Sequence, residues 1–129
     1  MTGPEVFFAK LFAGAFGRQD AAELAGFLAE DADVLTLTGA VLETAAEAEA
    51  AFAGEFAGIF AAARLVTGKH RLRMLGPGAC VVTQRFVVSG ARDDQGAEMP
   101  RFGAILTAVL TARSTGWQAV SLTFSAAGQ

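Results

Sequence analysis

Few residues in this chain carry side chains that could do chemistry. The sequence contains one histidine, one cysteine and one tryptophan, and it has no tyrosine. The histidine, His70, lies in a stretch where apolar and basic residues alternate, and it falls on the apolar side with Val66, Leu72 and Met74. Two interpretations stay open: His70 is hydrogen-bonded within the core or at a pocket rim, or it serves as a general base or ligand contact.

Arg85 is the second candidate, because it lies in the middle of an apolar stretch and a buried charge there needs a partner. The partner would be an acidic residue of the first half, such as Glu43 or Glu47, an acidic residue of a second subunit, or a ligand carboxylate or phenolate. Side chains alternate along a strand, so Thr83 shares the face of Arg85 and Gln84 does not.

Several chemistries lack the residues that they need. One histidine and one cysteine, Cys80, cannot supply three zinc ligands at the usual spacings. The chain has no glycine-rich phosphate turn after a strand, and no serine in a nucleophile elbow. We therefore expect no metal and no cofactor. Cys80 is interpreted as a small buried residue on a strand, and a lone cysteine fits a reducing cytoplasm.

Composition favours one domain, residues 1–129, with more apolar surface than a small monomer needs. Hydrophobic residues make up 53% of the 129 residues and charged residues 18%. Such a chain lines an internal cavity, buries an interface, or does both. No apolar run reaches the length of a membrane span, and no signal peptide is evident. We expect a cytoplasmic protein with no membrane partner.

Charge is distributed unevenly between the two halves. The net charge is −3 overall, but it is −8 for residues 1–63 and +5 for residues 64–129. Pairing between layers or between subunits explains this division, and an anion-tolerant sheet surface is the alternative. The basic residues are not interleaved with aromatic ones, so we expect no nucleic-acid partner.

Three capping boxes indicate three helices in the first half. They begin at Thr2, Asp20 and Thr44, each followed by glutamate three residues later. The first helix ends at Gly17, and the apolar face of the second includes Leu28. In the third, five apolar residues face inward and Glu49 and Glu55 face solvent, by helical spacing. The inward residues are Ala48, Phe52, Phe56, Ile59 and Phe60.

The second half has the period of strands rather than helices. Short turns join its segments, so we expect antiparallel pairing. The four predicted strands cover residues 65–75, 80–89, 102–112 and 117–124. A small hairpin, 34–38 with 41–42, precedes the third helix. Trp117 begins the last strand and is interpreted as a core residue or as part of a pocket wall.

An ordered set of residues resembles the nuclear transport factor 2-like superfamily, most closely its SnoaL-like and SgcJ/EcaC-type bacterial branches. The matching segments are Asp20 with Leu24 and Leu28, the run 30–33, Thr38-Gly39, Phe52 and Phe56, the run 80–82 with Arg85 and Ser89-Gly90, 105–107 with Val109-Leu110, and Gly116-Trp117. The resemblance implies an α+β cystatin-like cone, in which a curved, mostly antiparallel sheet wraps helices around a pocket. It also implies a homodimer formed through the sheet.

The resemblance implies catalytic positions that this chain does not fill. The position of an acidic base on the first strand of ketosteroid isomerase-like members is Thr36, and threonine cannot abstract a carbon-bound proton at neutral pH. The tyrosine oxyanion donor and the histidine pair of other members are absent. The His-Asn that tends to end the last strand of SgcJ/EcaC-like members corresponds to Thr123 and Phe124.

Two functions remain after these comparisons. The first is a binder of an apolar small molecule, or an isomerase-like or cyclase-like enzyme, whose pocket residues are His70, Arg85, Thr36, Thr83 and Trp117. The second is a non-catalytic homodimeric interaction module whose cone is filled by side chains. A cavity inside the cone distinguishes the two, because a cone filled by side chains would rule out the first. The missing catalytic set favours binding over catalysis.

Overall fold

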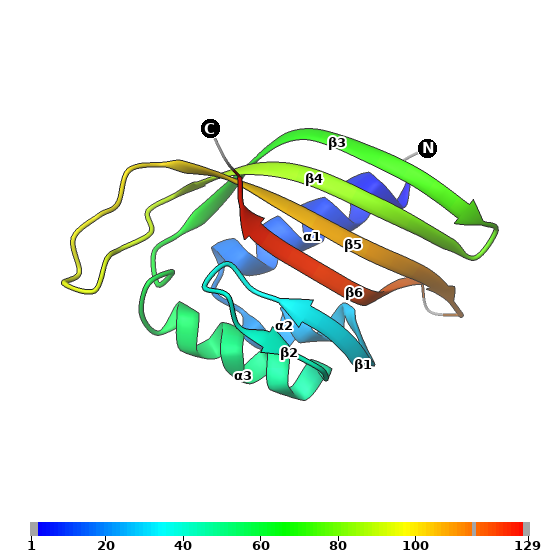
Figure 1. Ribbon diagram of the computed structural model, residues 1–129, viewed down its shortest axis with the longest axis horizontal. Helices are drawn as coiled ribbons and strands as arrows, with labels where there is room; N and C mark the ends of the chain where they lie inside the picture. The colour runs from blue at the N-terminus through cyan, green and yellow to red at the C-terminus, as the bar shows by residue number, and fades with distance from the viewer. Residues whose placement is uncertain (1–2, 115, 128–129) are drawn as a thin grey trace.

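The computed structural model describes residues 3–114 and 116–127, which form a curved six-stranded sheet with helices on one face (Figure 1). The strands lie in the order β2-β1-β6-β5-β4-β3. Their bounds are β1 Leu28–Leu35, β2 Val41–Leu42, β3 Arg64–Gly76, β4 Ala79–Ser89, β5 Phe102–Arg113 and β6 Gly116–Ala126. All neighbours pair antiparallel except β1 and β6, which are parallel. The predicted α+β architecture is confirmed.

The three helices are α1 Pro4–Gly17, α2 Ala21–Gly26 and α3 Ala45–Phe56. The Asp20 side chain caps α2 by accepting the Glu23 amide N–H at 3.0 Å, and Thr44 caps α3 by accepting that of Glu47 at 3.1 Å. Both caps were predicted. The predicted Thr2 cap lies outside the described residues. Gly3 is the N-cap of α1 and Pro4 follows it in the first turn.

Phenylalanine rings fill the space between the helices and the concave, inner face of the sheet. Phe12 and Phe16 of α1 meet Phe124 of β6 edge-on, with ring centroids 5.3 and 5.9 Å apart. Phe16 also meets Phe56 of α3 at 5.1 Å, and all four rings are buried. Ring pairs of this geometry add stability beyond their buried area. Aromatic side chains therefore occupy the middle of the cone.

The second helix is shorter than the sequence indicated, and Leu28 belongs to the sheet. α2 ends at Gly26, and β1 begins at Leu28, which pairs with Ala119 of β6. The prediction that Leu28 belongs to the helix was wrong. Leu28 is buried, and a buried apolar residue at this position is compatible with a helix or with a strand, so spacing alone could not distinguish them. Pairing with a strand about 90 residues later decided between them.

A β-bulge in β3 overturns one prediction about its faces. The strand carries one extra residue between Thr67 and His70 relative to β4, at Gly68 and Lys69. Val66 was predicted to share the face of His70, but the extra residue reverses the alternation. Val66 therefore lies on the outer face, with 53% of its surface exposed.

Gln84 explains how the bulge is accommodated. Its side chain is buried, and its amide nitrogen lies within hydrogen-bond distance of the carbonyl oxygens of Gly68, Lys69 and Arg85, at 3.0, 3.3 and 2.8 Å. A buried carbonyl group that loses its ladder partner needs another donor. Gln84 supplies that donor from the neighbouring strand.

No helix within residues 3–114 and 116–127 is both long enough and apolar enough to cross a lipid bilayer.

Candidate functional site

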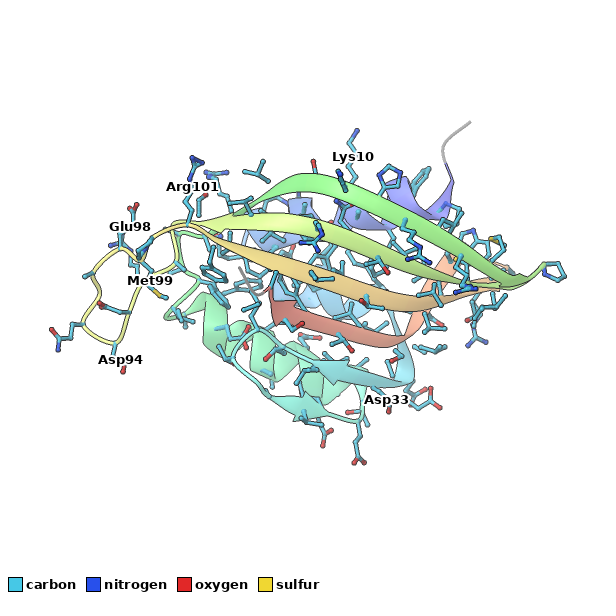
Figure 2. The ribbon with its side chains drawn as sticks, turned by 45° about the horizontal axis from the view of Figure 1, so that its top comes forward. Lys10, Asp33, Asp94, Glu98, Met99 and Arg101 are labelled. Carbon is cyan, nitrogen blue, oxygen red and sulfur yellow. The ribbon has the colours of Figure 1, made fainter. Side chains whose placement is uncertain are left out.

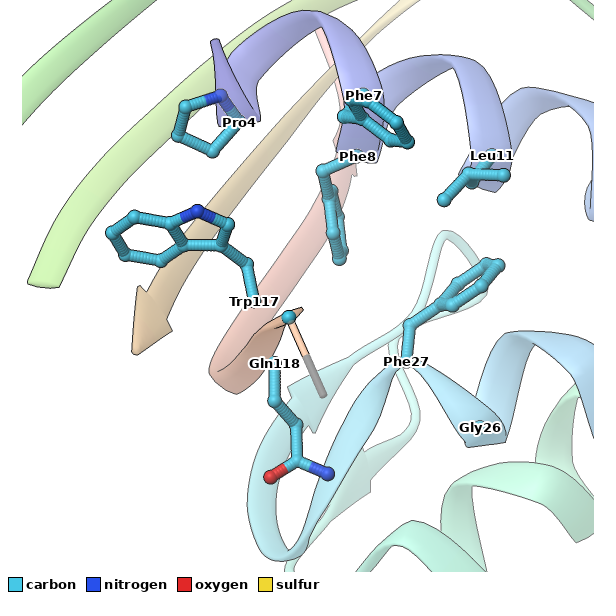
Figure 3. Close-up of a pocket in the computed structure, with 9 residues that line it drawn as sticks. Pro4, Phe7, Phe8, Leu11, Gly26, Phe27, Trp117 and Gln118 are labelled. Carbon is cyan, nitrogen blue, oxygen red and sulfur yellow. The ribbon is translucent and has the colours of Figure 1, made fainter. Parts of the chain in front are cut away.

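An apolar pocket of about 600 Å³ opens at the end of the molecule where α1 begins. Three segments that are distant in sequence form it: the first two turns of α1, the junction between α2 and β1, and the start of β6 (Figure 3). Its lining residues are Pro4, Phe7, Phe8, Leu11, Gly26, Phe27, Gly116, Trp117 and Gln118.

Main-chain and side-chain hydrogen bonds hold the junction of α2 and β1 against β6. The Ala119 N–H donates to the Phe27 carbonyl oxygen at 2.8 Å, and the Gln118 side-chain amide donates to that of Leu28 at 3.2 Å. Phe27 then meets Phe8 edge-on, with centroids 6.1 Å apart. The back of the pocket is therefore anchored to the sheet and to the aromatic core.

The opposite wall of the pocket belongs to α1 and is less covered. Phe7 and Leu11 lie on the flank of α1 beside the Phe8–Phe12 stripe, and they are 60% and 43% exposed. Trp117 and Pro4 lie on one side of the cavity, and Leu11 and Phe27 lie on the other (Figure 3). The walls of the cavity therefore combine aromatic rings with aliphatic side chains.

Of the predicted site residues, Trp117 lines this pocket and Thr36 lies near the far end of β1. Thr36 is buried, its hydroxyl oxygen accepts the Ala40 N–H at 3.3 Å, and it lies 3.2 Å from the Thr38 hydroxyl. Its hydroxyl therefore takes part in the turn between β1 and β2.

The other three predicted site residues lie on β3 and β4. His70 faces the inner side of the sheet, but it is exposed because β3 is the edge strand. Arg85 is exposed on the outer face, where it shares a side with half-buried Thr83. The expectation that Arg85 is a buried charge was wrong, because no helix within residues 3–114 and 116–127 covers this face (Figure 1). The five residues do not converge, and their roles in ligand binding stay predictions.

Glu55 of α3 forms a hydrogen-bonded group with two threonines of the turn between β1 and β2, which the sequence did not reveal. The Thr38 hydroxyl donates to Glu55 Oε2 at 2.6 Å, and Thr36 continues the chain through Thr38. Glu55 is only 8% exposed, although it was predicted to face solvent. Because a hydroxyl group has one proton and that of Thr38 goes to Glu55, the Thr36 hydroxyl donates to the Thr38 oxygen.

The sequence held a signal for both features that were missed. Glu55 lies three residues after Phe52 and seven after Ala48, which places it on the buried side of α3. Phe7 and Leu11 widen the apolar face of α1 beyond what one contact with the sheet covers. The width of this apolar face indicates that α1 borders a second apolar region besides the sheet. It does not indicate which other segment lines that region.

No protein-family model matches this sequence. No curated protein matches it in sequence either. Solved structures, in contrast, match over nearly the whole chain. An uncharacterised protein with a cystatin-like fold from Caulobacter vibrioides superposes with a TM-score of 0.82 at 15% identity, covering 93% of this chain and 84% of its own.

Two further structures agree. A ketosteroid isomerase-like protein from Erwinia carotovora atroseptica has a TM-score of 0.77 at 12% identity, covering 94% of this chain and 92% of its own. A nuclear transport factor 2-like protein of unknown function in nutrient uptake, from Rhodospirillum rubrum, has a TM-score of 0.73 at 21% identity, covering 98% and 100%. The chain has the cystatin-like fold of nuclear transport factor 2-like proteins.

Proposed function

We propose that this protein binds a small apolar molecule, aromatic or polyketide-like in character, in the end pocket. The observation that supports the proposal is a cavity of about 600 Å³ with Phe7, Phe8, Phe27 and Trp117 in its walls. Small-molecule sites are typically about 300–1,000 Å³, mostly apolar, and carry a few polar groups. Here Gln118 supplies a side-chain amide at the rim.

The proposal differs from the sequence-based hypothesis in where the ligand sits. That hypothesis placed the ligand within the cone, with His70, Arg85 and Thr36 as polar contacts. The aromatic core occupies that space, so we propose the pocket at the mouth, beside the start of α1, as the ligand site instead. An isomerase-like or cyclase-like reaction on the bound molecule would go one step further, and it is supported only by the likeness in fold to a ketosteroid isomerase-like protein. We also propose that the protein resides in a reducing cytoplasm, because a single cysteine fits that compartment.

Trp117 provides a direct readout, because it is the only tryptophan of a chain without tyrosine. The neutral probe N-phenyl-1-naphthylamine should accept energy from Trp117 and saturate. Gly26 lines the pocket, and a Cβ added there meets no atom within 4 Å. Gly26→Leu should therefore place an isobutyl group in the cavity and weaken probe binding at least tenfold, because it occupies the ligand's volume.

The matched control is Gly54→Leu, an exposed glycine of α3 where an added Cβ also meets nothing within 4 Å. It should leave probe binding unchanged. Equal affinity in the Gly26→Leu variant, or no saturable binding to the parent protein, contradicts the proposal.

A second candidate function is a non-catalytic homodimeric interaction module. The filled interior favours it, since Phe12, Phe16 and Phe124 are buried and in mutual ring contact at the centre of the cone. The working part of such a module would be the outer face of the sheet. Its test is sedimentation velocity of the full chain over a range of concentrations, and a monomer at every concentration would contradict it.

A further inference from the structure

The end pocket is bordered by main chain as well as by side chains where β6 begins. Gly116, Trp117 and Gln118 are consecutive residues, and all three line the cavity. Neighbouring side chains of a strand point to opposite faces, and those of Trp117 and Gln118 leave β6 in different directions in Figure 3. Consecutive residues line one cavity when the strand itself runs along the wall. The edge of β6 is therefore part of the pocket.

The main-chain N–H and C=O groups of Trp117 point away from β5. Trp117 lies opposite Ala112 of β5, and the Ala112 N–H donates at 2.9 Å to the carbonyl oxygen of Gly78, just before β4. The polar groups of Ala112 thus face β4, so its pair with Trp117 is one of the non-hydrogen-bonded pairs of the antiparallel ladder. Trp117 turns both groups towards the other edge of β6, which is the edge that pairs with β1.

β1 does not extend far enough to pair with these two groups. The Ala119 N–H of β6 donates to the Phe27 carbonyl oxygen at 2.8 Å. A longer parallel ladder would next give the Phe27 N–H to the Trp117 carbonyl oxygen, but that N–H donates to Leu24 of α2 at 3.1 Å. Within the part of the chain that the structure describes, no hydrogen bond on this side satisfies the Trp117 main chain. Its donor and its acceptor are both open to a ligand.

The pocket offers no charge to complement a charged ligand. Of the described residues that line it, none has an ionisable side chain. Gln118 already donates its side-chain amide to the Leu28 carbonyl oxygen at 3.2 Å. Figure 2 shows Asp94, Glu98 and Arg101 at the opposite end of the sheet from the start of α1. A charged group would lose its hydration in this cavity without gaining a partner, which favours a neutral ligand.

We propose that the ligand of the end pocket is a neutral lactam, whose adjacent N–H and C=O bind the C=O and N–H of Trp117. A strand residue pairs with the residue facing it by exchanging both N–H···O bonds, and the edge of a lactam carries the same donor and acceptor. The apolar part of the molecule then lies among the aromatic walls, which include Phe8 and Phe27. This inference rests on the proposed function and adds the class of ligand.

A peptide strand fits this edge less well than a lactam, because only one residue of β6 is open. Gly116 and Gln118 alternate with Trp117, so their main-chain groups face β5. Ala119 is already bonded to Phe27. Peptides that add a strand to a sheet gain affinity from a series of main-chain bonds. A single open residue matches a small molecule that the apolar walls hold in place.

Three bicyclic compounds test the inference on the full chain by isothermal titration calorimetry. 2-Quinolone carries its N–H and C=O on one edge. Its isomer 4-quinolone carries them on opposite edges, and N-methyl-2-quinolone lacks the N–H. 2-Quinolone should bind at least about tenfold more tightly than either, because each of the others leaves a main-chain group of Trp117 without a partner.

Amide hydrogen exchange locates the contact. With 2-quinolone bound, the Trp117 N–H should exchange at least about tenfold more slowly, whereas the Gln118 N–H, which faces β5, should keep its rate. Trp117→Phe is the matched variant, because it removes the indole N–H and keeps the main-chain pair. It should retain the preference for 2-quinolone over 4-quinolone.

The outcomes separate the class of ligand from the existence of the site. Equal affinity for the three compounds, loss of the preference in Trp117→Phe, or an unprotected Trp117 N–H would overturn the inference and leave the apolar site standing. So would saturable binding of N-phenyl-1-naphthylamine with no binding of 2-quinolone. If neither the quinolones nor N-phenyl-1-naphthylamine binds, the inference and the proposed function are both wrong.

Discussion

The same strands build the inner and outer faces of the sheet, but the side chains on the two faces differ in how fully they are buried. On β5, four inward side chains have no exposed surface, and those between them stay half-buried. The fully buried residues are Ala104, Leu106, Ala108 and Leu110. The inward side chains are therefore fully packed within the chain, whereas the outward ones keep part of their surface exposed. Stability should therefore depend more on the inner face than on the outer one.

Phe124 and its neighbour Thr123 give the largest expected contrast between the faces. Phe124→Ala should lower the free energy of unfolding by about 3–5 kcal/mol, because it opens a cavity where Phe12, Phe16 and Phe86 converge. Thr123→Ala, one residue earlier and on the outer face, should cost less than about 0.5 kcal/mol. Urea denaturation of both variants measures the difference. Similar losses would mean that the two faces are equally packed.

Gln84 offers an intermediate contrast, because it is the buried amide on a strand whose adjacent residues face outward. Gln84→Leu should cost about 1–3 kcal/mol, since the carbonyl groups of Gly68 and Lys69 lose their donor. Thr83→Val, on the outer face, should change stability by less than about 0.5 kcal/mol. Hydrogen exchange of the β3 amides near the bulge should rise in the Gln84 variant alone. An unchanged exchange rate would show that the bulge does not need the amide.

Glu55 and Glu49 sharpen the same contrast on α3. Glu55→Gln should cost about 1 kcal/mol, because the charge-assisted bond from the Thr38 hydroxyl becomes a neutral one. Glu49→Gln, at an exposed position of the same helix, should stay within about 0.5 kcal/mol of the parent. Thermal unfolding at neutral pH distinguishes them. If both substitutions are equally mild, the carboxylate contributes nothing that an amide cannot.

The local sequence pattern predicted helices and strands well wherever it was compatible with only one kind of element. Asp20 and Thr44 begin their helices as expected. The side chain of each accepts a hydrogen bond from the free backbone N–H three residues later. The four long strands lie within about two residues of their predicted bounds, since alternation and turn glycines are properties of the strand itself.

Prediction failed where a partner distant in sequence decided the outcome. Leu28 is apolar and buried in either structure, so only the pairing with Ala119 assigned it to a strand. Val66 changed faces because one extra residue in β3 is stabilised by Gln84, 18 positions later. Arg85 was judged by its apolar neighbours along the chain, but its exposure depends on the absence of a covering layer across β4.

The candidate site shows the same division. The sequence left Trp117 open as a core residue or as part of a pocket wall, and in the structure it lines the end pocket. No periodicity within α1 or β6 could have brought Pro4 and Phe27 to the same cavity, because that depends on how the α2–β1 junction docks on β6.

By itself, the sequence determined the kinds of elements, most of their boundaries, the apolar excess and the scarcity of catalytic side chains. Those properties follow from interactions among residues a few positions apart and from composition. Only the tertiary structure decided that the cone is filled with phenylalanine, that the cavity lies at its mouth, and that no described helix covers the outer face of the sheet (Figure 1). Each of these depends on which strands pair and in what register, and a shift of one residue would send every side chain of a strand to the other face.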